Sequence, residues 1–86
     1  MKILELRQLQ RTENGLYYRR KFSAEARVEI PIAVLELPIR FTIETSPFGS
    51  RDIDLEFLKT PDYPLIPIKT ALLKTIADLD TQGKLP

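Results

Sequence analysis

The 86-residue sequence contains no cysteine and no histidine. Without cysteine, disulfide scaffolds, thiolate metal sites and cysteine nucleophiles are excluded. Without histidine, the commonest general base and the commonest ligand of transition metals are missing, so a Ser-His-Asp triad is impossible. Carboxylate chemistry, lysine chemistry and an oxygen-liganded Mg²⁺ or Ca²⁺ site remain open. We expect a protein that is not an enzyme and that holds no cofactor.

Net charge and long apolar runs are lacking as well. The 13 basic and 12 acidic residues give a formal net charge of +1, so no overall field attracts nucleic acid or a membrane. No run approaches the roughly 20 apolar residues of a membrane span, and the N-terminal stretch is too short and too charged for a signal peptide. The sequence predicts a soluble, cytoplasmic protein without membrane contact, and one domain over residues 1–86.

Alternating apolar and polar residues predict several β-strands. The first covers residues 2–11 and precedes Thr12–Gly15, where Asn-Gly is a strong hairpin signal. The stretch GLYYRRKF, residues 15–22, is then the return strand. Four of its side chains share one face: Leu16, Tyr18, Arg20 and Phe22.

The clearest alternation, over residues 24–44, changes phase once. Apolar residues are even-numbered up to Val34 and odd-numbered from Leu35. Because no Gly, Asn or Asp occurs in this stretch, we predict a β-bulge at Val34–Leu35, with a loose turn around Glu36 as the alternative. Two prolines lack an amide donor and favour an edge strand or the bulge itself: Pro31 and Pro38.

The second half of the chain predicts a hairpin and then a helix. Residues 39–57 form the hairpin, around a turn at Ser46–Ser50. The proline-rich segment Lys59–Pro67 is predicted to cross over in extended form, packed on the sheet. A helix follows from Pro67, stops at Gly83, and repeats apolar residues at helical spacing: Ile68, Leu72, Ile76 and Leu79. The predicted fold class is α+β: a curved antiparallel sheet of four or five strands, with one C-terminal helix packed on its apolar face.

A first candidate site is basic and aromatic. It comprises Tyr17, Tyr18, Arg19, Arg20 and Lys21. Cations could contact phosphates while a tyrosine stacks on a base, as in proteins that bind single-stranded nucleic acid. The order of four strands and a helix is similar to that of the Pur-type nucleic-acid modules, although no residues of that family are matched. Successive cations face opposite sides of a strand, so a solvated basic strand is the favoured interpretation.

A second candidate site is acidic. Pairing Phe41 with Leu55 in the hairpin places four carboxylates along one exposed strip: Glu44, Asp52, Asp54 and Glu56. Like charges directly opposite each other are mildly destabilising. Such a strip could bind a hard cation or a basic partner, but solubility and edge protection explain it equally simply. If this strip adjoins the basic strand, Arg19 and Lys21 are expected to pair with Asp54 or Glu56.

The sequence also has more apolar strand surface than one helix can cover, which predicts an interface. A homodimer through sheet faces or edges would account for it. The proline spacing of Pro61, Pro64 and Pro67 could suit an aromatic groove, but a packed crossover is favoured. The main hypothesis is a small, non-enzymatic interaction module that self-associates and binds a protein partner. The alternative is a single-stranded nucleic-acid-binding protein that uses residues 17–21.

Overall fold

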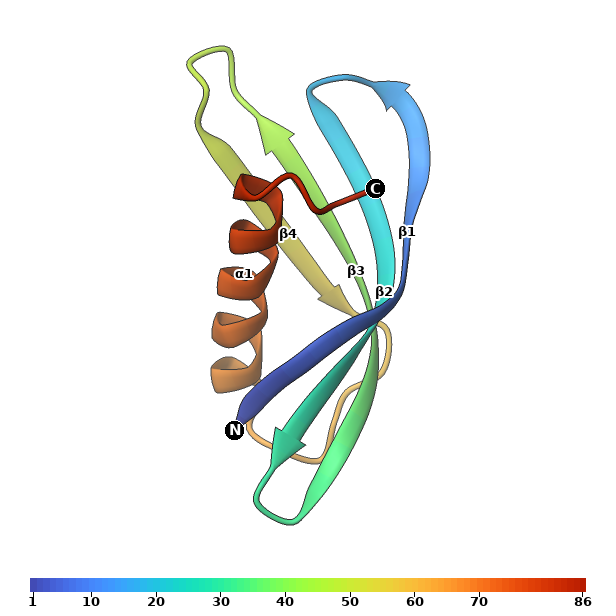
Figure 1. The fold of residues 1–86 in the computed structure, drawn as a ribbon, viewed down its shortest axis with the longest axis vertical. Helices are drawn as coiled ribbons and strands as arrows, with labels where there is room; N and C mark the ends of the chain where they lie inside the picture. The colour runs from blue at the N-terminus through green and yellow to red at the C-terminus, as the bar shows by residue number, and fades with distance from the viewer.

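The computed structural model describes the backbone of residues 1–86 and the side chains of residues 1–12 and 17–86. Four strands precede one helix in the described chain, as Figure 1 shows: β1 (Lys2–Leu16), β2 (Arg19–Ile30), β3 (Ala33–Thr45), β4 (Arg51–Phe57) and α1 (Leu65–Thr81). The strands form one antiparallel sheet in the order β1-β2-β3-β4. The predicted α+β class is confirmed, with four strands. None of the described helical residues form a segment with the length and hydrophobicity to cross a membrane.

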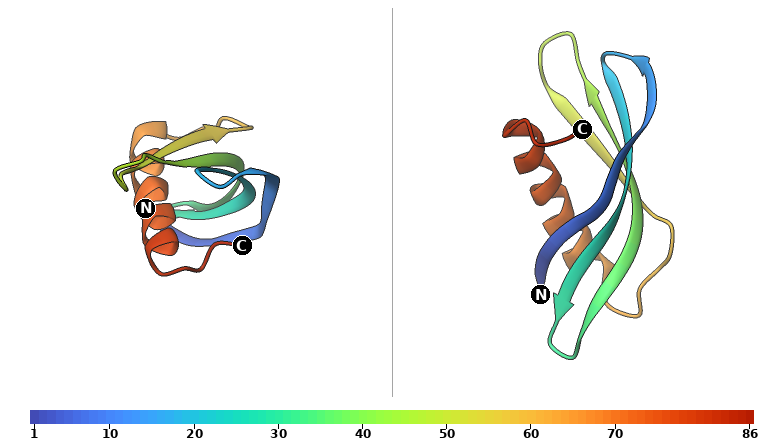
Figure 2. Two further views of the ribbon diagram at one scale, coloured as in Figure 1. Left: turned by 90° about the horizontal axis from the view of Figure 1, so that it is seen from above. Right: turned by 45° about the vertical axis from the view of Figure 1, so that its right-hand side comes forward.

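One face of the sheet is apolar, and α1 packs on it. Its centre is the pair Phe22 and Phe41, which lie opposite each other on β2 and β3 with ring centroids 5.0 Å apart. Three helix residues close the core from above, and all are fully buried: Ile68, Leu72 and Ile76. The views in Figure 2 show the sheet curving around the helix. The helix is therefore held mainly by burial of its apolar stripe.

The connection between β1 and β2 differs from the predicted one. The Asn14–Gly15 turn was expected to end the first strand, but its side chains lie outside those described, and β1 continues through both residues to Leu16. The turn is Tyr17–Tyr18, because Leu16 pairs with Arg19. The two tyrosines are therefore turn residues, and the predicted return strand begins only at Arg19.

The predicted bulge at Val34–Leu35, like its alternative near Glu36, is wrong. Ile30 pairs with Ala33, so β2 and β3 are joined by a two-residue turn at Pro31–Ile32. Neither turn residue has a positive φ, so this is not one of the primed turns that need Gly or Asn. Proline at the first turn position presets the required negative φ. Ten further residue pairs follow in unbroken register from Glu29–Val34 to Arg20–Ile43.

Pro38 lies in β3, which is a central strand and not an edge strand as predicted. Its carbonyl oxygen accepts a hydrogen bond from Leu58 N at 2.9 Å, immediately after β4 ends. The amide and the carbonyl of one residue point to the same side of an antiparallel strand. The missing donor of Pro38 therefore faces the point where the ladder with β4 stops, and the ladder with β2 is unaffected.

β1 is irregular where β2 and β3 are regular. Its register against β2 shifts at four places, one of them between Arg7 and Gln10. At that place Gln8 has a φ of 53°, a left-handed conformation that is unusual for a residue with a side chain. Bulges increase the local twist of a strand. They allow β1 to bend along the curved sheet (Figure 1).

The helix ends as the sequence predicts, but begins earlier. α1 starts at Leu65, so Pro67 lies in its first turn. At the other end Gly83 has a φ of 69°, and two backbone bonds close the last turn: Gly83 N to Asp80 O at 3.1 Å, and Lys84 N to Leu79 O at 2.9 Å. This pair of bonds is a Schellman motif, in which glycine readily takes the left-handed position.

The segment between β4 and α1 is not packed as predicted. Leu65 and Ile66 were expected to lie on the sheet, but they belong to the helix and are exposed, Ile66 by 79%. Tyr63 is the residue of this segment that packs against the core. The proline-rich segment is thus anchored by one aromatic side chain.

Candidate functional site

Two tight turns lie side by side at one end of the molecule. They are the β1–β2 turn and the β3–β4 loop, and a hydrogen bond from Thr45 N to Tyr18 O, 2.8 Å long, joins them. Figure 1 shows both at the same end, beyond the C-terminal end of α1. We call this part of the surface the aromatic end and define it by four residues: Tyr17, Tyr18, Pro47 and Phe48.

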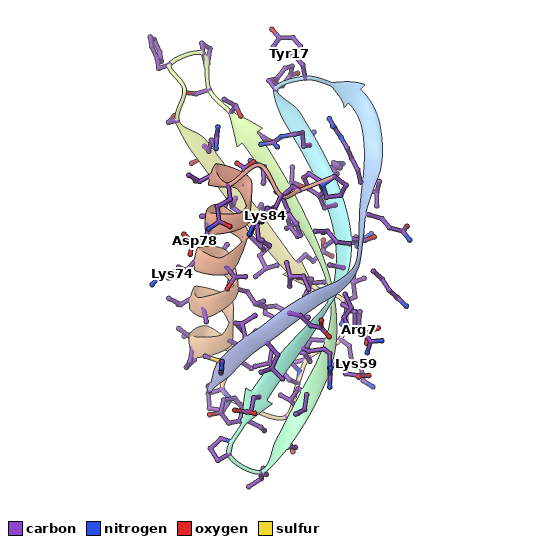
Figure 3. All side chains as sticks on the ribbon, viewed as in Figure 1. Arg7, Tyr17, Lys59, Lys74, Asp78 and Lys84 are labelled. Carbon is purple, nitrogen blue, oxygen red and sulfur yellow. The ribbon has the colours of Figure 1, made fainter. Side chains whose placement is uncertain are left out.

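The side chains of the aromatic end are strongly exposed. Tyr17 is 95% exposed and Phe48 97%. Figure 3 shows Tyr17 projecting beyond the end of the strands. The rings of Tyr17 and Tyr18 meet edge to face, with centroids 5.7 Å apart, a geometry that aromatic pairs prefer. Exposed aromatic side chains gathered in one place usually mark a binding surface.

The loop that carries Phe48 is fixed by its own hydrogen bonds. The Ser46 hydroxyl oxygen accepts from Phe48 N at 3.2 Å and from Ser50 N at 3.1 Å, and lies 2.7 Å from the Ser50 hydroxyl. Gly49 takes a φ of 89°, which a side chain would strain. The loop thus holds Phe48 outward in one conformation, and an ordered ring loses little conformational entropy on binding.

A groove of about 630 Å³ runs between the two turns. Five residues line it: Tyr17, Tyr18, Thr45, Ser46 and Pro47. Among the described side chains, the lining is made of rings, hydroxyl groups and a proline, without a charge. Such a groove can hold an apolar or aromatic group and give hydroxyls to its polar atoms.

The cations of the predicted basic site are separated by the strand. Arg20 points toward the helix side, where its guanidinium lies 3.0 Å from the Asp80 carboxylate. Arg19 lies on the opposite face, with its Nε 3.4 Å from Glu44. Lys21 shares that face with Arg19 and lies opposite Thr42. The structure therefore brings the two tyrosines together but distributes the three cations over two surfaces.

The predicted acidic strip has the register expected from the sequence. Glu44 lies opposite Asp52, Thr42 opposite Asp54, and Arg40 opposite Glu56. Two of the four carboxylates have cationic partners, since Arg19 contacts Glu44 and Arg40 Nη2 lies 3.1 Å from Glu56. Arg19 pairs with Glu44 on the neighbouring strand, not with Asp54 or Glu56 as predicted, because β3 separates β2 from β4.

The exposed face of the sheet is covered by ion pairs around β1, β2 and β3. Arg27 contacts both Glu5, at 3.2 Å, and Glu36, at 3.8 Å, while Arg7 contacts the same two carboxylates at 3.8 Å. Across this face the charges largely cancel. Among the side chains described, no group of acidic residues has the arrangement of a metal site. The strip on β4 is thus the acidic border of a nearly neutral surface.

The comparisons with known proteins give the family. A sequence profile of the BB-0187 family matches residues 1–81. The chain belongs to this family. The match spans every strand and the whole of α1, so the family profile covers the complete fold described above. No curated protein and no solved structure matches the chain.

Sequence reasoning missed Pro47 and Phe48 as members of a site. They stand 30 residues after the tyrosines in the chain, and only the side-by-side packing of two turns brings them together. One signal was present: SPFGS places a large aromatic residue in a turn, where polar residues are the rule.

Proposed function

We propose that the protein is a non-enzymatic interaction module, and that its aromatic end binds a short, extended, uncharged segment of a partner protein. The observation that carries this proposal is the exposure of Tyr17 and Phe48 on two adjoining turns that are fixed by hydrogen bonds. Solvent-exposed aromatic rings on rigid turns have a cost in water that a bound partner would remove.

The chemistry of the groove indicates the kind of segment. Tyrosine rings beside a proline, with hydroxyls at the rim, resemble in chemistry the aromatic grooves that bind proline-rich peptides. Such peptides are extended before binding and lose little entropy. A charged segment would lose its hydration against this lining without gaining a counter-charge.

The test is a fluorescence titration with a labelled proline-rich peptide, acetyl-Ser-Pro-Leu-Pro-Pro-Leu-Pro-amide. We expect saturable binding that weakens by about tenfold or more in Tyr17→Ala and in Phe48→Ala, since aromatic anchors commonly contribute about 2 kcal/mol. Ile66→Ala is the matched control, because Ile66 is a large exposed side chain at the other end of the molecule. Binding that is absent, or equal in all variants, would refute this role of the aromatic end.

The alternative function, binding of single-stranded nucleic acid, is supported by the same exposed tyrosines, which could stack on bases. The ion pairs of Arg19 with Glu44 and of Arg20 with Asp80 count against it, because both cations are already neutralised. The same titration with labelled single-stranded DNA and RNA separates the two functions. Binding with a steep dependence on salt, lost in Arg19→Ala/Lys21→Ala, would favour nucleic acid.

Self-association is the second part of the proposal. The exposed apolar side chains lie mainly at the two ends, with Phe48 at one and Ile32, 90% exposed, at the other. The exposed sheet face between the ends is largely charged. Contacts between copies are therefore proposed to be end-on.

A further inference from the structure

The sheet has two edges, and only one of them is regular. β1 and β4 are the outer strands in the order β1-β2-β3-β4. Seen from above in Figure 2, they lie at opposite borders of the curved sheet, with α1 in front of the face between them. β1 is interrupted by register shifts and by the left-handed Gln8. Such bulges protect an edge strand from pairing with another chain.

The edge of β4 carries none of these protections. All seven residues from Arg51 to Phe57 pair with β3 in continuous register. The strand contains no proline and no lysine, and its backbone dihedrals include no positive φ. In an antiparallel edge strand, alternate residues point their amide and carbonyl groups away from the sheet. β4 therefore presents a straight row of backbone donors and acceptors along its free side.

The two faces of β4 differ in chemistry. Asp52, Asp54 and Glu56 lie on the exposed face of the sheet, while Ile53 and Phe57 are half-buried on the helix side. Among the described side chains, no ion pair includes Asp52 or Asp54. A strand added at this edge would therefore meet carboxylates on one side and apolar carbon on the other.

A second copy of the chain does not fit this edge. A two-fold related β4 that continued the sheet with both helices on one side would place acidic side chains opposite acidic side chains. Like charges directly opposite one another on neighbouring strands are destabilising. The acidic border thus discourages pairing between copies, and it selects a partner of opposite charge.

We propose that the free edge of β4 binds an extended basic segment of a partner protein as a fifth strand. In this segment Lys or Arg alternates with aliphatic residues. The cations pair with Asp52, Asp54 and Glu56, the aliphatic side chains cover Ile53 and Phe57, and the backbone completes the ladder. Strand addition of this kind takes affinity from main-chain hydrogen bonds and specificity from alternate side chains. This surface is distinct from the aromatic end, and it takes a segment of different chemistry.

The test uses a fluorescein-labelled peptide, Gly-Lys-Val-Lys-Val-Lys-Val-Gly, added to the full chain. We expect binding that is stronger at about 50 mM than at about 150 mM salt, because the carboxylates are exposed and screened by ions. In the isosteric variant Asp52→Asn/Asp54→Asn/Glu56→Gln, we expect the dissociation constant to rise by about tenfold or more. The matched control is Glu25→Gln/Glu29→Gln, which removes charge from the same face on β2, away from the edge.

Two further peptides distinguish strand addition from charge attraction alone. A peptide of the same composition with its lysines consecutive, and a peptide N-methylated at every Lys and Val, keep the net charge but lose the alternation or the backbone donors. We expect both to lose binding, and we expect the parent peptide to slow hydrogen exchange of β4 amides. Equal binding of the N-methylated peptide, an unaffected triple variant, unchanged exchange in β4 or no binding of the parent peptide would each overturn the proposal.

Discussion

Asp80 is the least exposed carboxylate for which the structure gives ion pairs, with a side chain 7% exposed. It lies in the last turn of α1, where the helix dipole disfavours negative charge. Two guanidinium groups compensate for this, each 3.0 Å from one carboxylate oxygen: Arg20 from β2 and Arg51 from β4. The three residues thus link the end of the helix to two strands. Arg20, which the sequence suggested as a nucleic-acid contact, has this structural partner.

The first prediction concerns this link. In Asp80→Asn, Arg20 loses its counter-ion while its side chain stays only 23% exposed. We expect the free energy of unfolding to fall by about 2 kcal/mol, since removing one partner of a poorly hydrated pair leaves the other charge uncompensated. Urea unfolding would show a lower midpoint with an unchanged slope.

Two matched variants control the Asp80 prediction. Arg51→Gln should cost less than about 1 kcal/mol, because the Arg51 side chain is 48% exposed and its pairing is screened. Asp78→Asn removes an exposed carboxylate from the same helix end and should leave the stability equal or slightly higher. Equal losses in Asp80→Asn and Asp78→Asn would contradict the role of Asp80 as a link.

At the scale of the elements, the phase change between β2 and β3 could have predicted the turn. When two residues separate paired strands, the sequence numbers of opposite residues add to an odd number, as for Ile30 and Ala33. The inward set must then change from even to odd numbers. The sequence analysis looked for Gly or Asn, and so interpreted the same signal as a bulge. The proline turn needs neither residue, because its φ values are negative.

Other elements were predictable because their patterns are local. The pairing of Phe41 with Leu55 and the stripe of Ile68, Leu72 and Ile76 follow from alternation and helical period, and both are confirmed. The aromatic end was only half predictable, because Phe48 joins Tyr17 through the packing of two turns. The left-handed residue of β1 gave no signal, since Gln is not a residue that favours positive φ.

The second prediction tests this left-handed residue. At Gln8, glycine removes the clash between the side chain and the backbone, worth about 1 kcal/mol or more, but adds entropy to the unfolded chain. We expect Gln8→Gly to raise the free energy of unfolding by about 0.5 kcal/mol, and Gln8→Val to lower it by about 1 kcal/mol or more. Gln10→Gly is the control in the same strand, outside the positive-φ position, and should destabilise by about 0.5–1 kcal/mol. The sign difference between Gln8→Gly and Gln10→Gly, measured by thermal unfolding, decides the matter.

At the scale of the whole molecule, shape limits how copies of the chain can meet. The Cα trace extends 43 Å in one direction and 21 Å in each of the other two. An end face therefore offers on the order of 450 Å² per copy, less than the roughly 800 Å² per partner of a stable interface. The ends are large enough for a short peptide, but small for a second globular copy.

The third prediction follows from this limit. We expect the protein to sediment as a monomer at about 10 µM and to show rising average mass only at about several hundred µM, because an interface of this size gives weak association. Phe48→Ser/Ile32→Ser should abolish the rise, since it removes the exposed apolar side chain from each end. Leu58→Ser removes an exposed apolar side chain that is in neither end turn and should leave the rise unchanged. A compact dimer at about 10 µM that survives the double variant would require an interface along the 43 Å side, and would show that end-on contact is the wrong geometry.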